Sequence, residues 1–456
     1  MDDCVSLRGW VTKAAISQVF AAQRANRFTG QMDQRPIFSR IIDMTASGPQ
    51  ILVINSGSSS LKFSVLEVHS ESVLVSGIAE RLGTTEAFLR LSDPEAKKIE
   101  EPLPGADHRV ALRRVIDHLR TRLRNEIDAV GHRIVHGGEY FRDAVIIDDE
   151  VVKCIEELSD LAPLHNPPGA QGIRLASELF YGKPQVAVFD TAFHQTLPPR
   201  AFHYAIPARF YSQYRVRRYG FHGTSNQYVT QELARLLERP VSELQLLTAH
   251  LGNGCSATAV KQGRSVDTTM GLTPLEGVVM GTRSGDVDPS LHLFLQEREG
   301  LKLGEITDML TRESGLFGVS GISADMRSIL QAMEDGNARA ELAVDLFCYR
   351  LARGLLGLTA GLERIDGLIF TGGIGENSAV IRARVLNYLK VLRPEINEQW
   401  NRVHGRGNQG RITEETGLAC FVVPTNEELM IARQTAALVL RKPNRTLREP
   451  DAGRTL

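Results

Sequence analysis

Two arginines stand in settings where a guanidinium group could bind an anion. Arg133 lies in "VGHRIVHGGEYF" (130–141); if this stretch is a strand, Arg133 and Val135 share one face. A guanidinium beside a small apolar side chain suits a short-chain carboxylate, with charge at one end and a methyl group at the other. Arg283 lies in "MGTRSGDVDP" (280–289), a Gly-rich loop that is costly to order without a task. Arg283 is the candidate second anion clamp, and the alternative is a solvated surface turn.

Other side chains have types suited to group transfer. The apolar stretch "QVAVF" delivers Asp190 at its carboxyl end, where open α/β sheets place ligand groups; a helix-capping Asp is the alternative. His222 precedes "GTS", which is typical of a helix start, and its imidazole could stabilise anionic oxygens. A purely structural histidine is the alternative there. The spacing of His132 and His136 also admits a metal site, although on a strand both share the face opposite to Arg133.

Small polar turns occur twice between apolar runs. "NSGSSSLK" (55–62) shares Gly57 and Lys62 with the phosphate loop G-x-x-x-x-G-K-[ST], but it lacks the second glycine and continues as a strand. "HLGNG" (250–254) follows another apolar strand in the same way. Gly and Ser leave room for backbone N–H groups to approach phosphate oxygens. Two such hairpins facing each other would clamp a polyphosphate; the alternative is a pair of ordinary hairpin turns.

Two transitions from strand to helix carry further candidates. "GLIFTGGIGENS" (367–378) is an apolar strand, then a Gly-rich turn, then a helix, which suits the close approach of a nucleotide. "FVVPTNEELM" (421–430) opens a helix with Asn426 and Glu427. Glu427 is explained either as a helix cap or, if a cleft lies beside it, as a Mg²⁺ ligand through water.

The elements that must position these groups alternate between strands and helices, which predicts α/β layers. Strands are expected at 51–55, 61–68, 129–135, 185–190, 246–251, 256–260, 367–371 and 419–423. Helices are expected at 107–124, 150–160, 169–180, 225–238, 290–298, 304–312, 324–334, 338–363, 377–389 and 426–441. The segments 51–67 and 246–263 share a strand–turn–strand plan, which indicates two duplicated halves.

Length and composition bound the class of protein. A chain of 456 residues predicts two or three domains. Lys plus Arg number 53 and Asp plus Glu 54, so no global charge favours nucleic acid or an acidic membrane as a partner. No apolar run is long enough to predict a membrane span, and five cysteines without a C-x-x-C pair suggest reduced thiols and a cytoplasmic location. Residues 1–49 are expected to be an extension that is disordered or not native, with Met44 as a candidate start, and 443–456 a flexible tail.

Eight motifs, taken together and in their order, closely resemble the acetate kinase family. They are "NSGSSSLK", "GHRIVHGGE", "FDTAFH", "YGFHGTS", "HLGNG", "MGTRSGDVDP", "GGIGENS" and "PTNEEL". The resemblance runs from about Ile51 to Arg433, and "MGTRSGDVDP" and "FDTAFH" are highly specific. It implies an α/β fold of two duplicated actin-like (ribonuclease H-like) domains with a nucleotide cleft between them. The expected first domain is 50–192 plus 427–442, and the second, nucleotide-binding domain is 193–426.

The resemblance also implies a role for each matching position. The catalytic positions are Arg133, Asp190, His222 and Arg283. The metal-associated positions are Asn55 and Glu427. The first phosphate turn holds Ser58, Ser60 and Lys62, and the second holds His250, Leu251, Gly252, Asn253 and Gly254. The adenosine side is formed by Asp325, Met326, Arg327, Gly373, Ile374, Gly375, Glu376 and Asn377. The acetate methyl pocket is formed by Val135, Leu164, Phe221 and Pro274, beside Arg133.

The reaction that the resemblance implies is ATP + acetate ⇌ ADP + acetyl phosphate, with Mg²⁺ or Mn²⁺ as cofactor, ATP as co-substrate and a homodimeric protein. A propionate or other short-chain acyl kinase shares nearly every motif, and Val135 favours the smaller acyl group. An alternative of another class is an ATP-driven chaperone or filament-like binding protein. Such a protein would keep the phosphate hairpins but would need no pair such as Arg133 and Arg283. Neither nucleic acid nor a membrane is expected as a partner.

Overall fold

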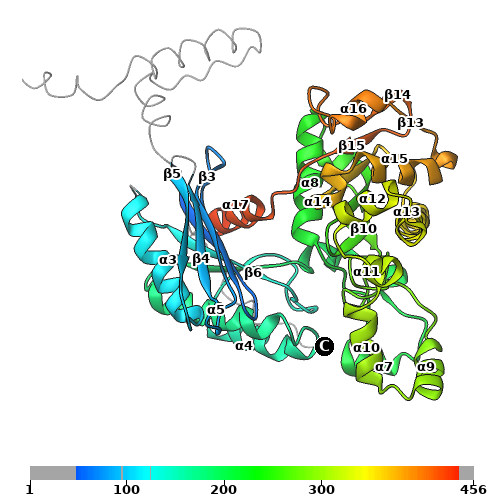
Figure 1. Cartoon of the computed structure of the whole chain (residues 1–456). Helices are drawn as coiled ribbons and strands as arrows, with labels where there is room; N and C mark the ends of the chain where they lie inside the picture. Colours follow the sequence, from blue (N-terminus) through cyan, green and yellow to red (C-terminus); the bar gives the residue numbers. More distant parts are fainter. Residues whose placement is uncertain (1–47, 94–95, 124, 441–456) are drawn as a thin grey trace, which may run out of the picture.

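The computed structural model describes residues 48–93, 96–123 and 125–440. The expected N-terminal extension, apart from residues 48 and 49, and the expected tail lie outside this part of the chain. Two lobes lie side by side, each built on one β-sheet (Figure 1). A small two-stranded sheet, β13 (Pro394–Ile396) with β14 (Thr413–Gly417), lies in the second lobe.

The first lobe contains an eight-stranded sheet in the order β5-β4-β3-β2-β1-β6-β8-β7. Its strands are β1 (Gln50–Ser56), β2 (Leu61–Glu67), β3 (Ser72–Glu80), β4 (Phe88–Asp93), β5 (Ala96–Pro102), β6 (Ala129–Ile134), β7 (Val145–Ile146) and β8 (Gln185–Phe189). β1 and β2 form an antiparallel hairpin in which Asn55 lies opposite Lys62. β1 pairs in parallel with β6, and β6 with β8, so Arg133 and Asp190 reach the same edge of the sheet.

The second lobe contains a five-stranded sheet in the order β11-β10-β9-β12-β15. Its strands are β9 (Gln245–Leu251), β10 (Cys255–Lys261), β11 (Arg264–Thr268), β12 (Gly367–Thr371) and β15 (Cys420–Val422). β9 and β10 form an antiparallel hairpin, and β9 pairs in parallel with β12, which pairs in parallel with β15. Strands β3-β2-β1-β6-β8 of the first sheet have the same order and the same directions. This shared topology confirms the predicted duplicated α/β fold.

Side chains along β1 point alternately to two apolar clusters, and this explains how the two lobes pack. Leu52 and Ile54 point to a core that includes α3 (His108–Arg122), whereas Ile51 and Val53 point to the opposite face. On that face they pack with α17 (Glu427–Val439), with α8 (Gly223–Leu236) and with strands of the second sheet. These two helices therefore lie between the sheets and share one apolar cluster (Figure 1). The position of α17 on the first sheet fits the predicted domain division, whose boundaries stay a prediction.

The remaining helices surround the sheets. In the first lobe they are α4 (Asp149–Glu157) and α5 (Asn166–Leu179). The chain between β8 and β9 forms α6 (Pro199–Phe202) and α7 (Arg209–Tyr214) before α8. The second lobe adds α9 (Leu291–Glu299), α10 (Leu303–Arg312), α11 (Gly315–Ser320), α12 (Met326–Glu334), α13 (Ala338–Leu358), α14 (Gly372–Asn377), α15 (Ala379–Tyr388) and α16 (Glu398–Arg402). Short polar caps start several of them: the side chains of Asp107, Asp325 and Asn426 accept backbone N–H groups at the starts of α3, α12 and α17.

Several predicted elements need correction. The strands β3, β4, β5, β7 and β11 were not predicted. Of these, β5 and β11 are edge strands rich in polar residues, and β7 is an edge strand of only two residues. The segment "GGIGEN" was predicted as a turn before a helix, yet residues Gly372–Asn377 are themselves a short helix. The helix predicted from 169 begins at Asn166, since prolines are tolerated in the first helical turn.

Two expectations from composition concern the membrane and the thiols. Among the helices that the structure describes, none combines the length and the apolar character needed to cross a bilayer. Cys154, Cys255, Cys348 and Cys420 are free thiols, and all but the first are buried. Burial raises the pKa of the Cys255 and Cys348 thiols to about 12, so neither is a reactive thiolate near neutral pH.

Candidate active site

Arg133 and Asp190 form a buried ion pair at the edge of the first sheet. The guanidinium of Arg133 donates a hydrogen bond to Asp190, and its Nε lies 3.5 Å from a carboxylate oxygen of Glu427. Asp190 is 2% exposed and also accepts a hydrogen bond from the Thr224 hydroxyl at 3.1 Å. Burial raises the pKa of the Asp190 carboxyl above its usual value, although Arg133 and Thr224 oppose this shift. The arrangement orients Arg133 into the space between the lobes.

His222 and His250 form a stacked pair beside the second hairpin turn. Their ring centroids are 4.2 Å apart and the rings are tilted by 25°. The Nδ1 atom of His222 is hydrogen-bonded to the Ser256 hydroxyl at 3.0 Å. Burial lowers the pKa of His250 to about 4 and that of His222 well below its ordinary value, so both rings are neutral near pH 7. Such rings act as hydrogen-bonding groups rather than as cations.

Gly254 marks the point where three of the predicted groups meet. A Cβ atom at this position would lie 3.4 Å from Nε2 of His222 and 3.4 Å from Nη1 of Arg283. The glycine leaves this space empty, so a phosphate oxygen could approach the turn, the imidazole and the guanidinium together. The turn is closed by a hydrogen bond from the Gly252 N–H to the Gly254 carbonyl at 3.0 Å.

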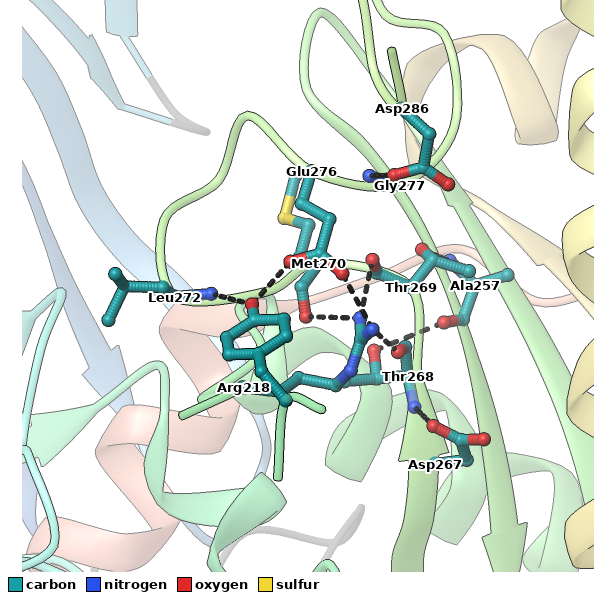
Figure 2. A network of polar contacts seen from close by, with 11 residues as sticks. Arg218, Ala257, Asp267, Thr268, Thr269, Met270, Leu272, Glu276, Gly277 and Asp286 are labelled. Atoms are coloured by element: carbon teal, nitrogen blue, oxygen red, sulfur yellow. Dashed lines mark hydrogen bonds and ion pairs between the residues drawn. The ribbon is translucent and has the colours of Figure 1, made fainter. Parts of the chain in front are cut away.

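The loop between β11 and α9 carries Arg283 and has almost no regular structure, so its shape depends on side chains from elsewhere. Figure 2 shows the guanidinium of Arg218 at its centre. Arg218 donates to the carbonyls of Thr268, Thr269 and Met270 at 3.0, 2.9 and 3.3 Å, and to Glu276 at 2.6 Å. The Tyr204 hydroxyl donates to the other oxygen of Glu276 and accepts from the Leu272 N–H at 2.8 Å. Asp286 closes the far side by accepting from the Gly277 N–H at 2.7 Å (Figure 2).

Arg283 differs from Arg133 in having no carboxylate within ion-pair distance among residues 48–93, 96–123 and 125–440. Its Nη1 donates to the Pro274 carbonyl at 3.1 Å. Burial lowers the pKa of its guanidinium below the usual value. A half-buried arginine without a counterion, next to a glycine turn, is suited to binding an anionic ligand.

Part of the predicted metal and phosphate set of the first lobe lines one cavity of about 360 Å³, whose lining residues do not include Ser58 and Ser60. It contains Asn55, Lys62, Arg133 and Glu427. Lys62 forms an ion pair at 2.6 Å with Glu428, a residue that the sequence argument missed. Glu428 follows Glu427 in "PTNEEL", so the second acid of that motif was the available signal. Ser58 lies at the exposed turn beside this cavity's lysine-bearing strand, and Gly57 donates its N–H to the Ser60 carbonyl at 2.9 Å.

The residues predicted for adenosine line a second cavity, of about 760 Å³, in the other lobe. Its walls include Gly252, Asn253, Asp325, Met326, Arg327, Gly373, Ile374 and Asn377. Hydrogen bonding to Arg327 lowers the pKa of Asp325 to about 2. Glu376 is oriented differently, because its carboxylate accepts from the backbone N–H groups of Gly372 and Thr425, each at 3.0 Å. The structure thus brings together most of this predicted set but engages Glu376 within the protein.

The predicted acyl pocket is assembled only in part. Val135 packs against the apolar cluster that contains Phe221, although the two residues belong to different halves of the chain. The Pro274 carbonyl accepts a hydrogen bond from Arg283. Leu164, by contrast, is 63% exposed. The structure therefore connects Val135 with the cluster of Phe221 and Pro274 with Arg283, whereas the place of Leu164 in an acyl pocket stays a prediction.

His165 is a site residue that sequence reasoning missed. It directly precedes α5 and is exposed. Its pKa is lowered by partial desolvation and by the positive charges of Arg133 and Arg283, while Asp190 opposes the shift. His165 is therefore within electrostatic range of all three groups. Its place before two prolines in "LHNPPG" gave no hint of this, because only the fold brings it near the arginines.

The alternative metal site at His132 and His136 finds no support. Nε2 of His132 is hydrogen-bonded to Gln185 at 2.7 Å, and Nδ1 of His136 accepts from the Gly138 N–H at 3.0 Å. Within the described ranges, no group of three or more His, Cys, Asp or Glu side chains could hold a metal ion. Burial lowers the pKa of both histidines to about 4, as expected for neutral core residues.

Comparison with known proteins gives a consistent result. Residues 50–433 match the model of the acetokinase family. The acetate kinase of Deinococcus radiodurans is 51% identical over 389 residues, which cover 85% of this chain and 98% of that protein. The acetate kinase of Halothermothrix orenii is 48% identical over 399 residues, covering 86% of this chain and 99% of that protein.

Solved structures show the same relationship. The acetate kinase of Porphyromonas gingivalis superimposes with a TM-score of 0.81 at 40% identity, over 86% of this chain and 100% of that chain. The propionate kinase of Francisella tularensis gives a TM-score of 0.81 at 41% identity, over 85% and 99% of the two chains. The resemblance predicted from the eight motifs is confirmed, and the chain belongs to the acetokinase family.

Proposed function

We propose that the protein transfers the γ-phosphoryl group of ATP reversibly to acetate, giving acetyl phosphate and ADP. The observation that carries this proposal is the meeting of two arginines from different lobes around a neutral histidine. A Cβ atom on Gly254 would lie 3.4 Å from both Nε2 of His222 and Nη1 of Arg283, so these two groups meet at the turn. Burial lowers the pKa of His222, and the positive charges of Arg133 and Arg283 lower it further. The family relatives that are acetate kinases, at 46–51% identity, support the same reaction.

The chemistry asks mainly for electrostatic stabilisation. Acetate is already ionised near neutral pH, so no base has to remove a proton from it. A carboxylate oxygen attacks the γ-phosphorus while the bond to the bridging oxygen of ADP breaks, and negative charge spreads over the equatorial oxygens. Arg283, the N–H of His222 and the backbone of the Gly252–Gly254 turn are suited to those oxygens. Each positioned donor of this kind contributes about 2.7–4 kcal/mol of transition-state stabilisation.

Arg133 and Asp190 have different roles: Arg133 binds an anionic oxygen, and Asp190 orients Arg133. In the described part of the chain Nε of Arg133 is buried without a hydrogen-bond partner, while its Nη2 is engaged by Asp190. Asp190 therefore fixes the direction of the guanidinium, and a bound carboxylate or phosphoryl oxygen would take the place of Glu427, whose carboxylate lies 3.5 Å from Nε. We assign Asp190 this orienting role, because the acceptor has no proton for it to abstract.

Mg²⁺ fits the residues that line the first cavity. Asn55 and Glu427 offer oxygen ligands from two different elements, and a magnesium ion commonly uses one or two protein ligands together with phosphates and water. Bound there, the ion would neutralise charge on the β- and γ-phosphates. Lys62 lies in the same cavity and would exchange its ion pair with Glu428 for a phosphate oxygen. The nucleotide base and ribose are assigned to the second cavity, beside Asp325 and Gly373.

Acetate and propionate remain the two candidate acceptors. Val135, which packs against the apolar cluster of Phe221, favours the shorter acid, whereas Leu164 is exposed. The similarity to the Francisella tularensis propionate kinase supports propionate as the alternative acceptor. The pair Arg133 and Arg283 and the family membership both favour a kinase over an ATP-driven binding protein. We further propose a cytoplasmic homodimer whose lobes close over ATP.

The test is an assay of the purified protein with Mg-ATP and acetate, propionate or butyrate, in which hydroxylamine traps the acyl phosphate. The highest kcat/KM with acetate supports the proposed function. A preference for propionate retains the mechanism and overturns the pocket argument. No acyl phosphate from any acid, with a folded protein that binds ATP, overturns the proposal.

A further inference from the structure

A chain of hydroxyl groups links the connector between the lobes to one of the stacked histidines. Ser225, in the first turn of α8, is fully buried. Its hydroxyl oxygen lies 2.8 Å from Nδ1 of His250 and 2.7 Å from the hydroxyl oxygen of Thr425. Thr425 lies between β15 of the second lobe and α17, which packs on the first sheet. This row of hydrogen-bonded groups therefore runs from the segment where the polypeptide crosses between the lobes to His250, beside the Gly252–Gly254 turn.

The hydrogens of this chain can be arranged in two ways. In the first, Thr425 donates to Ser225, Ser225 donates to Nδ1 of His250, and the ring carries its proton on Nε2. In the second, Nδ1 carries the proton and donates to Ser225, and Nε2 presents a lone pair. His250 is neutral near pH 7, so only one of its nitrogens is protonated. The two arrangements differ in what the ring offers to the cleft.

The position of Nε2 decides between them once an anion is present. A Cβ atom on Gly252 would lie 3.9 Å from Nε2 of His250, so this nitrogen faces the Gly252–Gly254 turn. A phosphate oxygen at that turn is an acceptor, and it would be repelled by a lone pair and attracted by an N–H group. We propose that Ser225 and Thr425 are positioning residues that hold His250 as an Nε2–H donor to the phosphates of ATP. This inference rests on the proposed kinase function.

The connector is itself anchored to the nucleotide side of the second lobe. The N–H of Thr425 donates to Glu376 at 3.0 Å, and Glu376 also accepts from the Gly372 N–H at the start of α14. This explains why Glu376 is engaged within the protein although it belongs to the Gly-rich motif. These contacts hold Thr425 within hydrogen-bond distance of Ser225 and so support the Nε2–H form of His250.

The chain provides matched controls for each hydroxyl. Thr230 lies on α8, as Ser225 does. Thr435 lies on α17, the helix that begins two residues after Thr425. The hydroxyl oxygens of Thr230 and Thr435 are buried and make no hydrogen bond within the described residues. Thr230→Val and Thr435→Val therefore each remove a buried hydroxyl and leave the hydrogen bonds between Thr425, Ser225 and His250 intact. Thr425→Ser keeps the hydroxyl and serves as the conservative variant of Thr425→Val.

The first measurement is kinetic. Thr425→Val and Ser225→Ala are expected to lower kcat/KM for ATP about tenfold, because each weakens a donor to a charged group. Thr425→Ser and both control variants are expected to stay within about twofold of the unchanged protein. An equal loss of kcat/KM in Thr425→Val and Thr435→Val would overturn the inference. A normal kcat/KM in both Thr425→Val and Ser225→Ala would do the same.

The second measurement reads the proton directly and needs no activity. Protein labelled with ¹⁵N-histidine is examined by NMR with ADP bound, and the His250 signals are assigned by their loss in His250→Gln. The Nε2–H form is expected in the unchanged protein and in Thr425→Ser, with the Nδ1–H form gaining in Thr425→Val. An Nδ1–H ring in the unchanged protein, or the same tautomer in every variant, would overturn the inference. A protein that makes no acyl phosphate but shows the expected tautomers would instead overturn only the kinase assignment.

Discussion

Replacing Arg283 by alanine is expected to abolish most of the catalysis and little of the stability. Arg283 has no carboxylate partner in the described part of the chain, and its main hydrogen bond is to the Pro274 carbonyl. Loss of that bond, offset by relief of a desolvated charge, changes the free energy of unfolding by about 1 kcal/mol or less. Loss of a positioned donor to the transferring group costs about 2.7–4 kcal/mol of transition-state stabilisation, or about 10²–10³ in kcat.

The assay pairs steady-state acyl phosphate formation with thermal unfolding. Arg283→Ala should show the fall in kcat together with a Tm within about 3 °C of the unchanged protein. Arg312→Ala is the matched surface control, because Arg312 follows Thr311, whose carbonyl accepts from Thr282 of the same loop, but is mostly exposed and forms an ion pair with Asp308 at 3.7 Å. It should change neither quantity measurably.

Arg133→Ala provides the contrast that makes the reasoning refutable. Removing Arg133 leaves Asp190 buried and unpaired, which costs about 3–5 kcal/mol of stability in addition to activity. If Arg283→Ala lowered the Tm as much as Arg133→Ala does, its role would be structural. If Arg283→Ala kept kcat within about fivefold of the unchanged protein, well short of the loss expected for a transition-state donor, Arg283 would have no part in phosphoryl transfer.

Three further outcomes follow from the site. Four buried histidines, among them His250, have a pKa of about 4 in the folded protein against 6.5 unfolded. The unfolded chain therefore binds protons first, so the Tm should fall as the pH drops from 6.5 to 4, and a flat profile would contradict this. Gly254→Ala should raise the KM for ATP at least about tenfold with an unchanged Tm, because the new methyl group occupies the space between His222 and Arg283; an unchanged KM would place the phosphates elsewhere. Glu276→Ala should lower kcat/KM for acetate by about tenfold and spare ADP affinity measured by calorimetry, since it removes the shared acceptor that shapes the loop; an equal loss of ADP affinity would point to general misfolding.

The groups at strand ends could be predicted from the sequence because their positions follow from local patterns. Arg133 and Asp190 lie at the carboxyl ends of neighbouring parallel strands, so alternation and fold class together were enough to bring them close. The two glycine turns were likewise predictable, since each lies between two strands of one hairpin. The two duplicated halves were predictable because both hairpins share one strand–turn–strand plan.

Contacts between distant segments could not be predicted in this way. The shape of the loop that carries Arg283 depends on Arg218 and Tyr204, whose side chains reach it from another part of the chain. Lys62 was predicted as part of the first phosphate hairpin and lies in its second strand, yet its ion-pair partner Glu428 lies on the last helix of the described chain. The edge strand β5 was missed because polar residues on a sheet edge weaken the alternation that reveals a strand.

The placement of α17 has a consequence for the order in which the molecule can be made. Ile51 and Val53 emerge from the ribosome near the beginning of synthesis, but the helix that covers them is among the last segments to follow. All of the second sheet is synthesised in between, and its strands can pair before the first sheet has its cover. The apolar cluster on the inner face of the first sheet can therefore be completed only when residues 427–439 arrive, after α8 and the second sheet.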